Sequence, residues 1–167
     1  LVIDLHGEYA IAFPDDTQII EADKLELPYW LLNFEEFQDL AVDVTEFTAH
    51  NQITGLRDAL LQARQKTAEV EEMGLSNSVT VDSPIYFDLQ GMLQQIRDWN
   101  IEMVPGAKGP KKGPLNGVFD RFLIRFDSKI NDPRFQFLFR PTTYSKNESL
   151  PQLLKEYLSI DTGKRMT

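Results

Sequence analysis

Two carboxylates near the start of the chain have the spacing that phosphate chemistry needs. Residues 1–5, Leu-Val-Ile-Asp-Leu, are apolar except for Asp4 and predict a short, buried strand of a parallel sheet. Residues 6–9 predict a tight turn, because Gly7 allows backbone angles that other residues resist. Asp4 then lies where open α/β sheets bind ligands, with Glu8 following in the turn. Such a pair can hold Mg²⁺ through water or position an attacking water beside a phosphate. A second interpretation stays open, in which Asp4 caps the turn and Glu8 pairs with a basic side chain.

The concentrated positive charge of the chain lies in one segment rich in Gly and Pro. Residues 105–114 contain Lys108, Lys111 and Lys112 among residues that break regular structure, so we expect no helix or strand there. Lysines on a loop are able to contact the phosphates of a nucleic acid. A disordered, solvated loop explains the same pattern, and the sequence leaves both interpretations open.

The histidines and tryptophans have structural interpretations beside functional ones. His6 is either a pH-sensitive ligand or a turn residue bonded to the backbone, and His50 lies near a predicted helix start. Two histidines so far apart make no case for a metal site. Trp30 and Trp99 are able to stack on bases, but their apolar neighbours favour packing in the core.

Composition limits the class of protein. The chain has 167 residues, 42% of them hydrophobic, and no cysteine, which excludes disulfide scaffolds, thiolate zinc sites and cysteine nucleophiles. Its formal charge of −9 argues against a surface that coats DNA or an anionic membrane as a whole, so any contact with nucleic acid must be local. The longest apolar runs, such as residues 28–32, are far shorter than the roughly 20 residues that cross a bilayer. We therefore expect a soluble, cytoplasmic protein that does not bind membranes.

Hydrophobic spacing predicts a mostly α-helical chain with a few β-strands near its termini. Asn33 and Glu36 form a capping-box pattern, Asp88 is placed to cap a second helix, and Gly74 is expected to stop the longest one. The predicted helices cover about residues 34–40, 50–73, 89–99, 116–129 and 150–158, and the predicted strands cover residues 1–5, 17–22 and 135–139. Helices in the middle and strands near both ends are what a helical insertion into an α/β sheet produces.

Three segments of the chain resemble the HerA-type ATPases, in the wider HerA/FtsK class of hexameric DNA-pumping motors. Residues 2–10, Val-Ile-Asp-Leu-His-Gly-Glu-Tyr-Ala, resemble the strand-turn motif that follows the Walker A helix in this family. Residues 27–36 resemble the Pro-aromatic-Trp-Leu-Leu segment that opens the family's helical insertion, and residues 132–139 resemble the Asp-Pro-Arg stretch before the Walker B strand. The resemblance implies that the chain carries the helical insertion domain of a RecA-like α/β ATPase core. It assigns the core to residues 1–27, the insertion to residues 28–133, and a return strand and helix to residues 134–167.

The resemblance also implies a reaction and its partners. It places ATP and Mg²⁺ at Asp4 and Glu8, with Asp4 near the metal, Glu8 near water or a neighbouring subunit, and His6, Gly7 and Tyr9 beside the nucleotide. It implies a homo-hexameric ring around duplex DNA that works with a nuclease or another effector protein in DNA processing, repair or phage defence. The three lysines of residues 105–114 are then the candidate DNA contacts of the insertion.

The motifs that carry phosphoryl transfer in this family do not occur in the sequence. There is no Gly-x-x-x-x-Gly-Lys-Ser/Thr, the Gly163-Lys164 pair lacks the preceding glycines, and no apolar strand ends in Asp-Glu. The family places these motifs before residue 1 and after residue 167, so we expect a piece of a longer ATPase that alone neither hydrolyses ATP nor holds a cofactor. The alternative, from another class, is a non-enzymatic helical module that binds partner proteins through exposed apolar faces.

Overall fold

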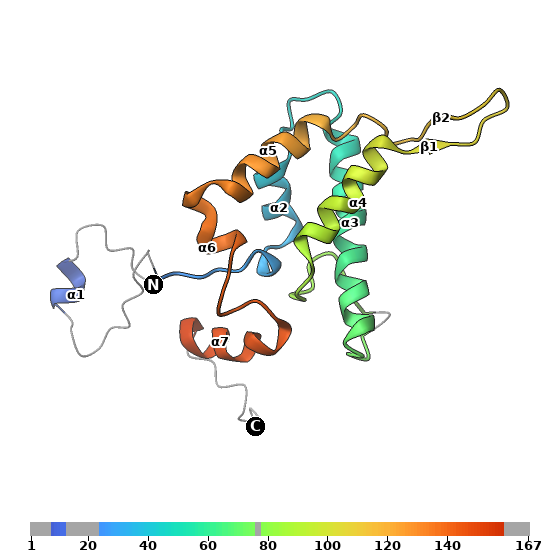
Figure 1. Cartoon of the computed structure of the whole chain (residues 1–167). Coiled ribbons are helices and arrows are strands. Elements are labelled where there is room, and N and C mark those ends of the chain that lie inside the picture. Colours follow the sequence, from blue (N-terminus) through green and yellow to red (C-terminus); the bar gives the residue numbers. More distant parts are fainter. Residues whose placement is uncertain (1–7, 13–23, 76–77, 159–167) are drawn as a thin grey trace.

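The computed structural model describes residues 8–12, 24–75 and 78–158, and within these ranges the chain is mostly helical, as the sequence predicts. The expected strands at residues 1–5 and 17–22 lie outside the described residues. The α-helices are α1 (Glu8–Ala12), α2 (Phe34–Ala41), α3 (Ala49–Val70), α4 (Leu89–Ile101), α5 (Asp120–Asn131), α6 (Gln136–Phe139) and α7 (Leu150–Leu158) (Figure 1). Three 3-10 helices, η1 (Tyr29–Leu31), η2 (Pro133–Phe135) and η3 (Asn147–Ser149), and two short strands, β1 (Met103–Val104) and β2 (Lys111–Lys112), complete the list.

Local capping starts two of these helices as the sequence predicts. At α2, the Asn33 side chain accepts the N–H of Glu36 at 2.9 Å, and the Glu36 carboxylate accepts the N–H of Asn33 at 2.8 Å, which is a complete capping box. At α4, the Asp88 carboxylate accepts the N–H of Gln90 at 3.0 Å. Both helices therefore begin where a side chain satisfies an otherwise unpaired backbone donor.

The end of α3 differs from the sequence expectation. The backbone turns left-handed at Glu72, with φ of 50°, two residues before the expected stop at Gly74. The N–H of Met73 bonds to the carbonyl of Ala68 at 3.0 Å, and the N–H of Glu72 bonds to the carbonyl of Glu69 at 3.1 Å, so the last free carbonyls are satisfied there. The exposed residues Glu69, Glu71 and Glu72 lie at the solvated C-terminal end of this helix.

Aromatic side chains from three helices make the centre of the core. Phe37 of α2, Phe122 and Phe126 of α5 and Phe139 of α6 are buried, and the Phe126 ring lies 5.6 Å from that of Phe122 and 5.5 Å from that of Phe139. α3 and α4 lie side by side along one flank of this core (Figure 1). Trp30 is fully buried and its Nε1 donates to the carbonyl of Tyr144 at 2.9 Å, which confirms the expected structural role of this tryptophan.

The segment before α7 folds differently from its expected strand. Residues 135–139 belong to η2 and α6, so the strand interpretation is wrong. Asp132 starts this turn, because its carboxylate accepts the N–H of Arg134 at 2.9 Å, and Pro133 has the fixed φ that suits a first helical position. The adjacent residues Leu138 and Phe139 are both buried, which a helical turn allows and an alternating strand does not.

The segment that leads into the helical body is bonded to the segment that leaves it. The carboxylate of Glu26 accepts the backbone N–H of Thr142 at 3.1 Å and of Thr143 at 2.9 Å, together with both threonine hydroxyls. The N–H of Leu27 donates to the carbonyl of Phe137 at 3.0 Å. The hydrophobic core includes residues on both sides of position 133. The division of the chain into an ATPase core and a helical insertion stays a prediction.

A buried arginine fixes the loop before α2 to the body. Arg64 of α3 has no exposed surface, and its guanidinium donates to the carbonyls of Trp30, Leu32 and Val81. Burial lowers the pKa of Arg64 to about 10, with Asp82 opposing that shift. The Arg64 side chain therefore holds two other stretches of the chain, residues 30–32 and the one at Val81, against α3. The helices of the described ranges include none that is long and apolar enough to cross a membrane.

Candidate nucleic-acid interface

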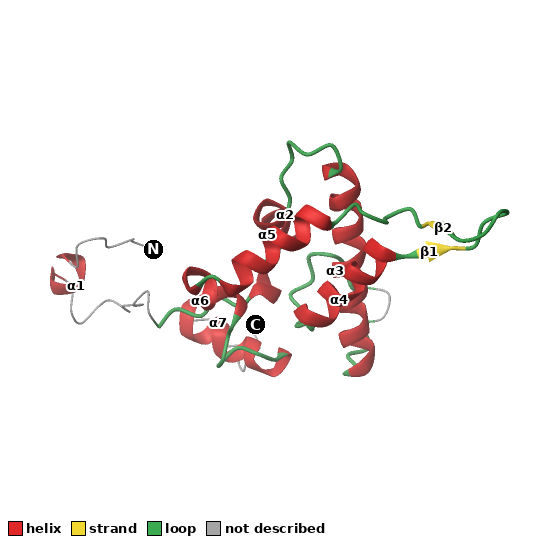
Figure 2. Ribbon diagram, turned by 45° about the horizontal axis from the view of Figure 1, so that its top comes forward, coloured by secondary structure: helices red, strands yellow, loops and turns green. Residues whose placement is uncertain are grey.

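The basic segment forms a β-hairpin rather than the irregular loop that its composition predicts. β1 and β2 pair antiparallel, with Met103 opposite Lys112 and Val104 opposite Lys111. The hairpin extends away from the helices at the end of α4, in both Figure 1 and Figure 2. The glycines and prolines that predicted irregular structure are concentrated in the tip between the two strands, where residues of these types favour a turn. This correction gives the three lysines defined positions.

All three lysines of the hairpin are exposed. Lys108 lies in the tip, and Lys111 and Lys112 form β2. Among the residues that the structure describes, none of the three has an ion-pair partner. An ammonium group that is solvated and free of carboxylates is available to a phosphate, which is the chemistry expected of a nucleic-acid contact.

The base of the hairpin is held by a buried asparagine that the sequence analysis missed. The Asn100 side chain, 8% exposed, accepts the N–H of Phe119 at 2.7 Å and donates to the Asp120 carboxylate at 2.6 Å. Its backbone carbonyl accepts the N–H of Gly117 at 2.9 Å. The signal available in the sequence is its position four residues after Ile96, on the buried face of α4, where a polar side chain requires partners.

A second contact closes the hairpin beside β1 and β2. The N–H of Gly113 donates to the carbonyl of Glu102 at 2.9 Å, and the same carbonyl accepts from the Asn116 side chain at 3.0 Å. A Cβ at position 113 would lie 3.2 Å from that carbonyl oxygen and 2.8 Å from Glu102 Oε2, so the close approach of the strands favours glycine. Together with Asn100, this contact sets the direction in which the lysines project.

The structure places few of the residues expected at a nucleotide site. Asp4, His6 and Gly7 lie outside the described residues. Glu8 is exposed and is the first residue of α1, and Tyr9 follows it in the same helix, so the turn expected at residues 6–9 is wrong for these two. An acidic residue in the first turn favours a helix because it faces the positive end of the helix dipole. The roles of these residues toward a nucleotide stay predictions.

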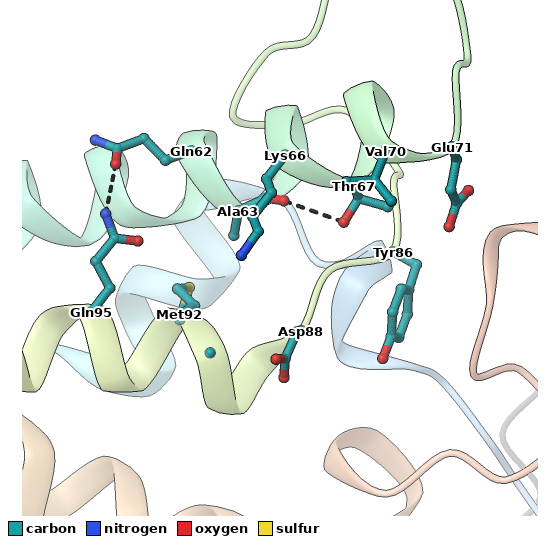
Figure 3. A pocket seen from close by; sticks show the side chains of 11 residues that line it. Gln62, Ala63, Lys66, Thr67, Val70, Glu71, Tyr86, Asp88, Met92 and Gln95 are labelled. Carbon is teal, nitrogen blue, oxygen red and sulfur yellow. Dashed lines mark hydrogen bonds between the residues drawn. The ribbon is translucent and has the colours of Figure 1, made fainter.

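A groove lies between α3 and α4, and the sequence did not indicate it. It measures about 540 Å³, and Lys66 extends from α3 toward α4 within it (Figure 3). Gln62 and Gln95 bond across one end at 2.6 Å, and Tyr86 lies near the other end. The groove is lined by a cation, Lys66, by the carboxylates of Glu71 and Asp88, and by apolar residues such as Ala63 and Met92. This mixture of groups does not indicate one class of ligand. The described residues include no group of three His, Cys, Asp or Glu side chains suited to a metal ion.

The remaining candidates have structural roles or a plain surface position. Trp99 is partly buried and packs against the core, so it joins Trp30 as a packing residue rather than a stacking platform. His50 is exposed in the first turn of α3, in agreement with its expected place near a helix start. The hairpin is therefore the surface of the described residues that combines free positive charge with a fixed geometry.

Comparison with known protein families gives one match. The family described as "Helicase HerA, central domain" matches residues 1–160, a span that includes the segment with Asp4 and Glu8, the hairpin and all the helices named above. No curated protein matches the chain.

Proposed function

Because the chain belongs to the family of the helicase HerA central domain, we propose that it is part of an ATP-dependent DNA translocase. The observation that carries this proposal is the family match from residue 1 to residue 160, which spans nearly the whole chain. The enzyme acts in the cytoplasm as a homo-hexameric ring around duplex DNA, with a nuclease or another effector protein as its partner, in DNA processing, repair or phage defence.

In this proposal the segment around Asp4 serves the nucleotide. ATP and Mg²⁺ supply the phosphoryl-transfer chemistry, and Asp4 lies near the metal, with His6, Gly7 and Tyr9 beside the nucleotide. Glu8 orients water or contacts a neighbouring subunit. Glu8 is exposed at the start of α1, which supports a role toward water or a neighbouring subunit.

The hairpin lysines contact DNA in this proposal. An acidic chain with a formal charge of −9 repels the DNA backbone, and Lys108, Lys111 and Lys112 stand apart from the helical body on a hairpin that extends from it (Figure 2). Binding through three lysines is weak and falls steeply as salt rises, since it depends on the release of counterions. A motor that moves along DNA requires contacts of this sequence-independent kind.

The test is the ATPase of the whole protein that carries this chain, with and without duplex DNA. We expect duplex DNA to stimulate turnover, and we expect Asp4→Asn and Glu8→Gln to lower turnover by about tenfold to a thousandfold at nearly unchanged nucleotide affinity, as groups that act in the transition state do. The 167-residue chain alone should show no turnover. Variants that keep turnover within about twofold but melt at lower temperature would make these carboxylates turn caps and contradict their assignment.

One observation favours the non-enzymatic alternative, a helical module that binds a partner protein. Phe47, in the loop between α2 and α3, is 104% exposed, and Val44 in the same loop is 68% exposed. Burial of such exposed apolar side chains by a partner protein is energetically favourable. A whole protein without ATPase that loses its protein partner on Phe47→Ser would support this alternative over the translocase.

A further inference from the structure

The register of the hairpin places its two strand lysines on opposite faces. Successive residues of a strand point to opposite sides, so Lys111 and Lys112 project in opposite directions from β2. Cross-strand partners share a face, and therefore Met103 accompanies Lys112 on one face while Val104 accompanies Lys111 on the other. Each face of the hairpin thus carries one cation beside one apolar side chain.

A two-stranded ribbon of this kind has the dimensions of one groove of DNA. Its strands lie about 4.8 Å apart, and with side chains on both faces it is too thick for the minor groove, which is about 6 Å wide. The major groove is about 12 Å wide and admits a β-ribbon. The tip adds no bulk, because residues 105–110 consist of glycine, proline, alanine and a single lysine.

We propose that the β1–β2 hairpin enters the major groove of duplex DNA and that Lys111 and Lys112 contact phosphates on the two opposite strands. The proposal rests on the proposed function, which supplies duplex DNA as the substrate. One lysine faces each wall of the groove, so the ribbon is centred between two rows of phosphates. The exposed Met103, 54% accessible, lies beside Lys112 on the same face and adds apolar contact area to the ribbon.

The hairpin follows the groove without selecting a sequence. Arg, Asn and Gln, which make bidentate contacts with base edges, are absent from residues 103–112, and the proposal assigns the strand lysines to phosphates rather than to guanine edges. The nearest asparagines, Asn100 and Asn116, are occupied at the base of the hairpin, where they bond to Phe119, Asp120 and the Glu102 carbonyl. Contacts to phosphate position a protein on DNA and carry no sequence information.

The experiment measures DNA binding by the whole protein with three duplexes of equal length. The first is unmodified, the second carries glucosylated 5-hydroxymethylcytosine, which fills the major groove, and the third is rich in A·T and saturated with netropsin, which fills the minor groove. Fluorescence anisotropy should show binding weakened by about tenfold or more on the glucosylated duplex, because the glucose groups exclude the ribbon from the major groove. Netropsin should change binding by less than about twofold, because it occupies only the minor groove.

Lysine variants test the two-strand contact. Lys111→Gln and Lys112→Gln should each lower the slope of log affinity against log salt by about 0.9, and the double variant by about twice that. Lys146→Gln, which removes an exposed lysine outside the hairpin, is the matched control and should leave the slope unchanged. Met103→Ala should weaken affinity with an unchanged slope.

The outcomes separate this inference from the function on which it rests. DNA-stimulated ATPase together with binding that netropsin blocks and glucosylation does not would overturn the major-groove placement and leave the translocase intact. A slope that is indifferent to Lys111 and Lys112 would overturn the phosphate contacts. A whole protein with neither DNA binding nor DNA-stimulated turnover would overturn the proposed function and this inference together.

Discussion

The side chain of Asn100, at the end of α4, accepts a hydrogen bond from the backbone N–H of Phe119 at 2.7 Å, on the far side of the hairpin. The two residues enclose the whole ribbon, and both are buried. A rigid base converts a short, two-residue strand pair, which is marginal by itself in water, into an extension with a defined direction. The position of the lysines therefore depends on a contact made inside the core.

Replacing Asn100 by Ala should lower the free energy of unfolding by about 2 kcal/mol, because it leaves the buried N–H of Phe119 and the Asp120 carboxylate without their partner. Urea denaturation followed by circular dichroism measures this loss. The control is Asn51→Ala, at an exposed position of α3, which should change stability by less than about 0.5 kcal/mol. Equal effects of the two variants would show that the hairpin base is not anchored at Asn100.

Replacing Arg64 should be among the most destabilising changes in α3. Arg64→Met removes the donor to the buried carbonyls of Trp30 and Val81 and to the partly buried carbonyl of Leu32, and we expect a loss of about 3 kcal/mol or more. Arg57→Met, on the exposed face of the same helix, removes only a cation–π contact with Phe34 and should cost about 0.5–1 kcal/mol. Thermal unfolding of both variants provides the comparison, and a smaller cost at Arg64 than at Arg57 would contradict the role given to it.

The contact of Glu26 with Thr142 and Thr143 predicts a stability that depends on pH. Burial acts to raise the pKa of Glu26, but hydrogen bonds from the Thr142 side chain and from the N–H groups of Thr143, Thr142 and Tyr144 outweigh it, and the pKa falls below the ordinary 4.5. The folded state therefore favours the carboxylate. Its contribution is fully present above pH 4.5 and is lost as the pH falls through the lowered pKa.

Glu26→Gln tests this contribution by comparison with the original protein across pH. Near pH 7 the variant should be less stable by about 1 kcal/mol, a figure that allows for the partial solvent exposure of the site. The difference should shrink as the pH is lowered from 5 toward 3. Urea denaturation at each pH measures it, and a difference that grows on acidification would contradict the assignment. Glu148→Gln, at an exposed position, serves as the control.

How far the sequence predicts the structure depends on how local each signal is. The capping box of Asn33 with Glu36 and the cap at Asp88 were predicted correctly, because each needs only a side chain and the backbone within three residues of it. The strand expected at residues 135–139 was wrong because partial alternation of apolar residues also fits a helical turn that Asp132 and Pro133 start.

The hairpin was missed because the contacts that form it are not local in sequence. Its composition of glycine, proline and lysine is that of a loop, and what makes it a hairpin is supplied by residues outside it, through the Asn100 side chain and the carbonyl of Glu102. Bonds between residues this far apart leave no periodic pattern in the sequence. The lysines themselves were predicted as candidate contacts, but their placement on two faces follows only from the strand register.

Changing Gly113 tests whether the hairpin base controls the DNA contact. Gly113→Ala places a Cβ 3.2 Å from the Glu102 carbonyl oxygen and 2.8 Å from Glu102 Oε2, so the strands must separate by a few tenths of an ångström. We expect a loss of about 1 kcal/mol in stability, with faster hydrogen exchange at the amides of Lys112 and Gly113. Because all three lysines remain, DNA affinity should fall while its salt slope stays as in the original protein.

The double variant Gly113→Ala with Glu102→Ala identifies which atoms matter. Removing the Glu102 side chain relieves the 2.8 Å contact with Oε2 and leaves the 3.2 Å contact with the backbone oxygen. Exchange at the hairpin amides should therefore return part of the way toward the original rate, since only the flexible neighbour has been removed. Exchange in Gly113→Ala that equals the original protein would show that the close approach of Gly113 to Glu102 does not hold the ribbon. In that case DNA affinity would depend on the charge of the lysines and not on the direction of the hairpin.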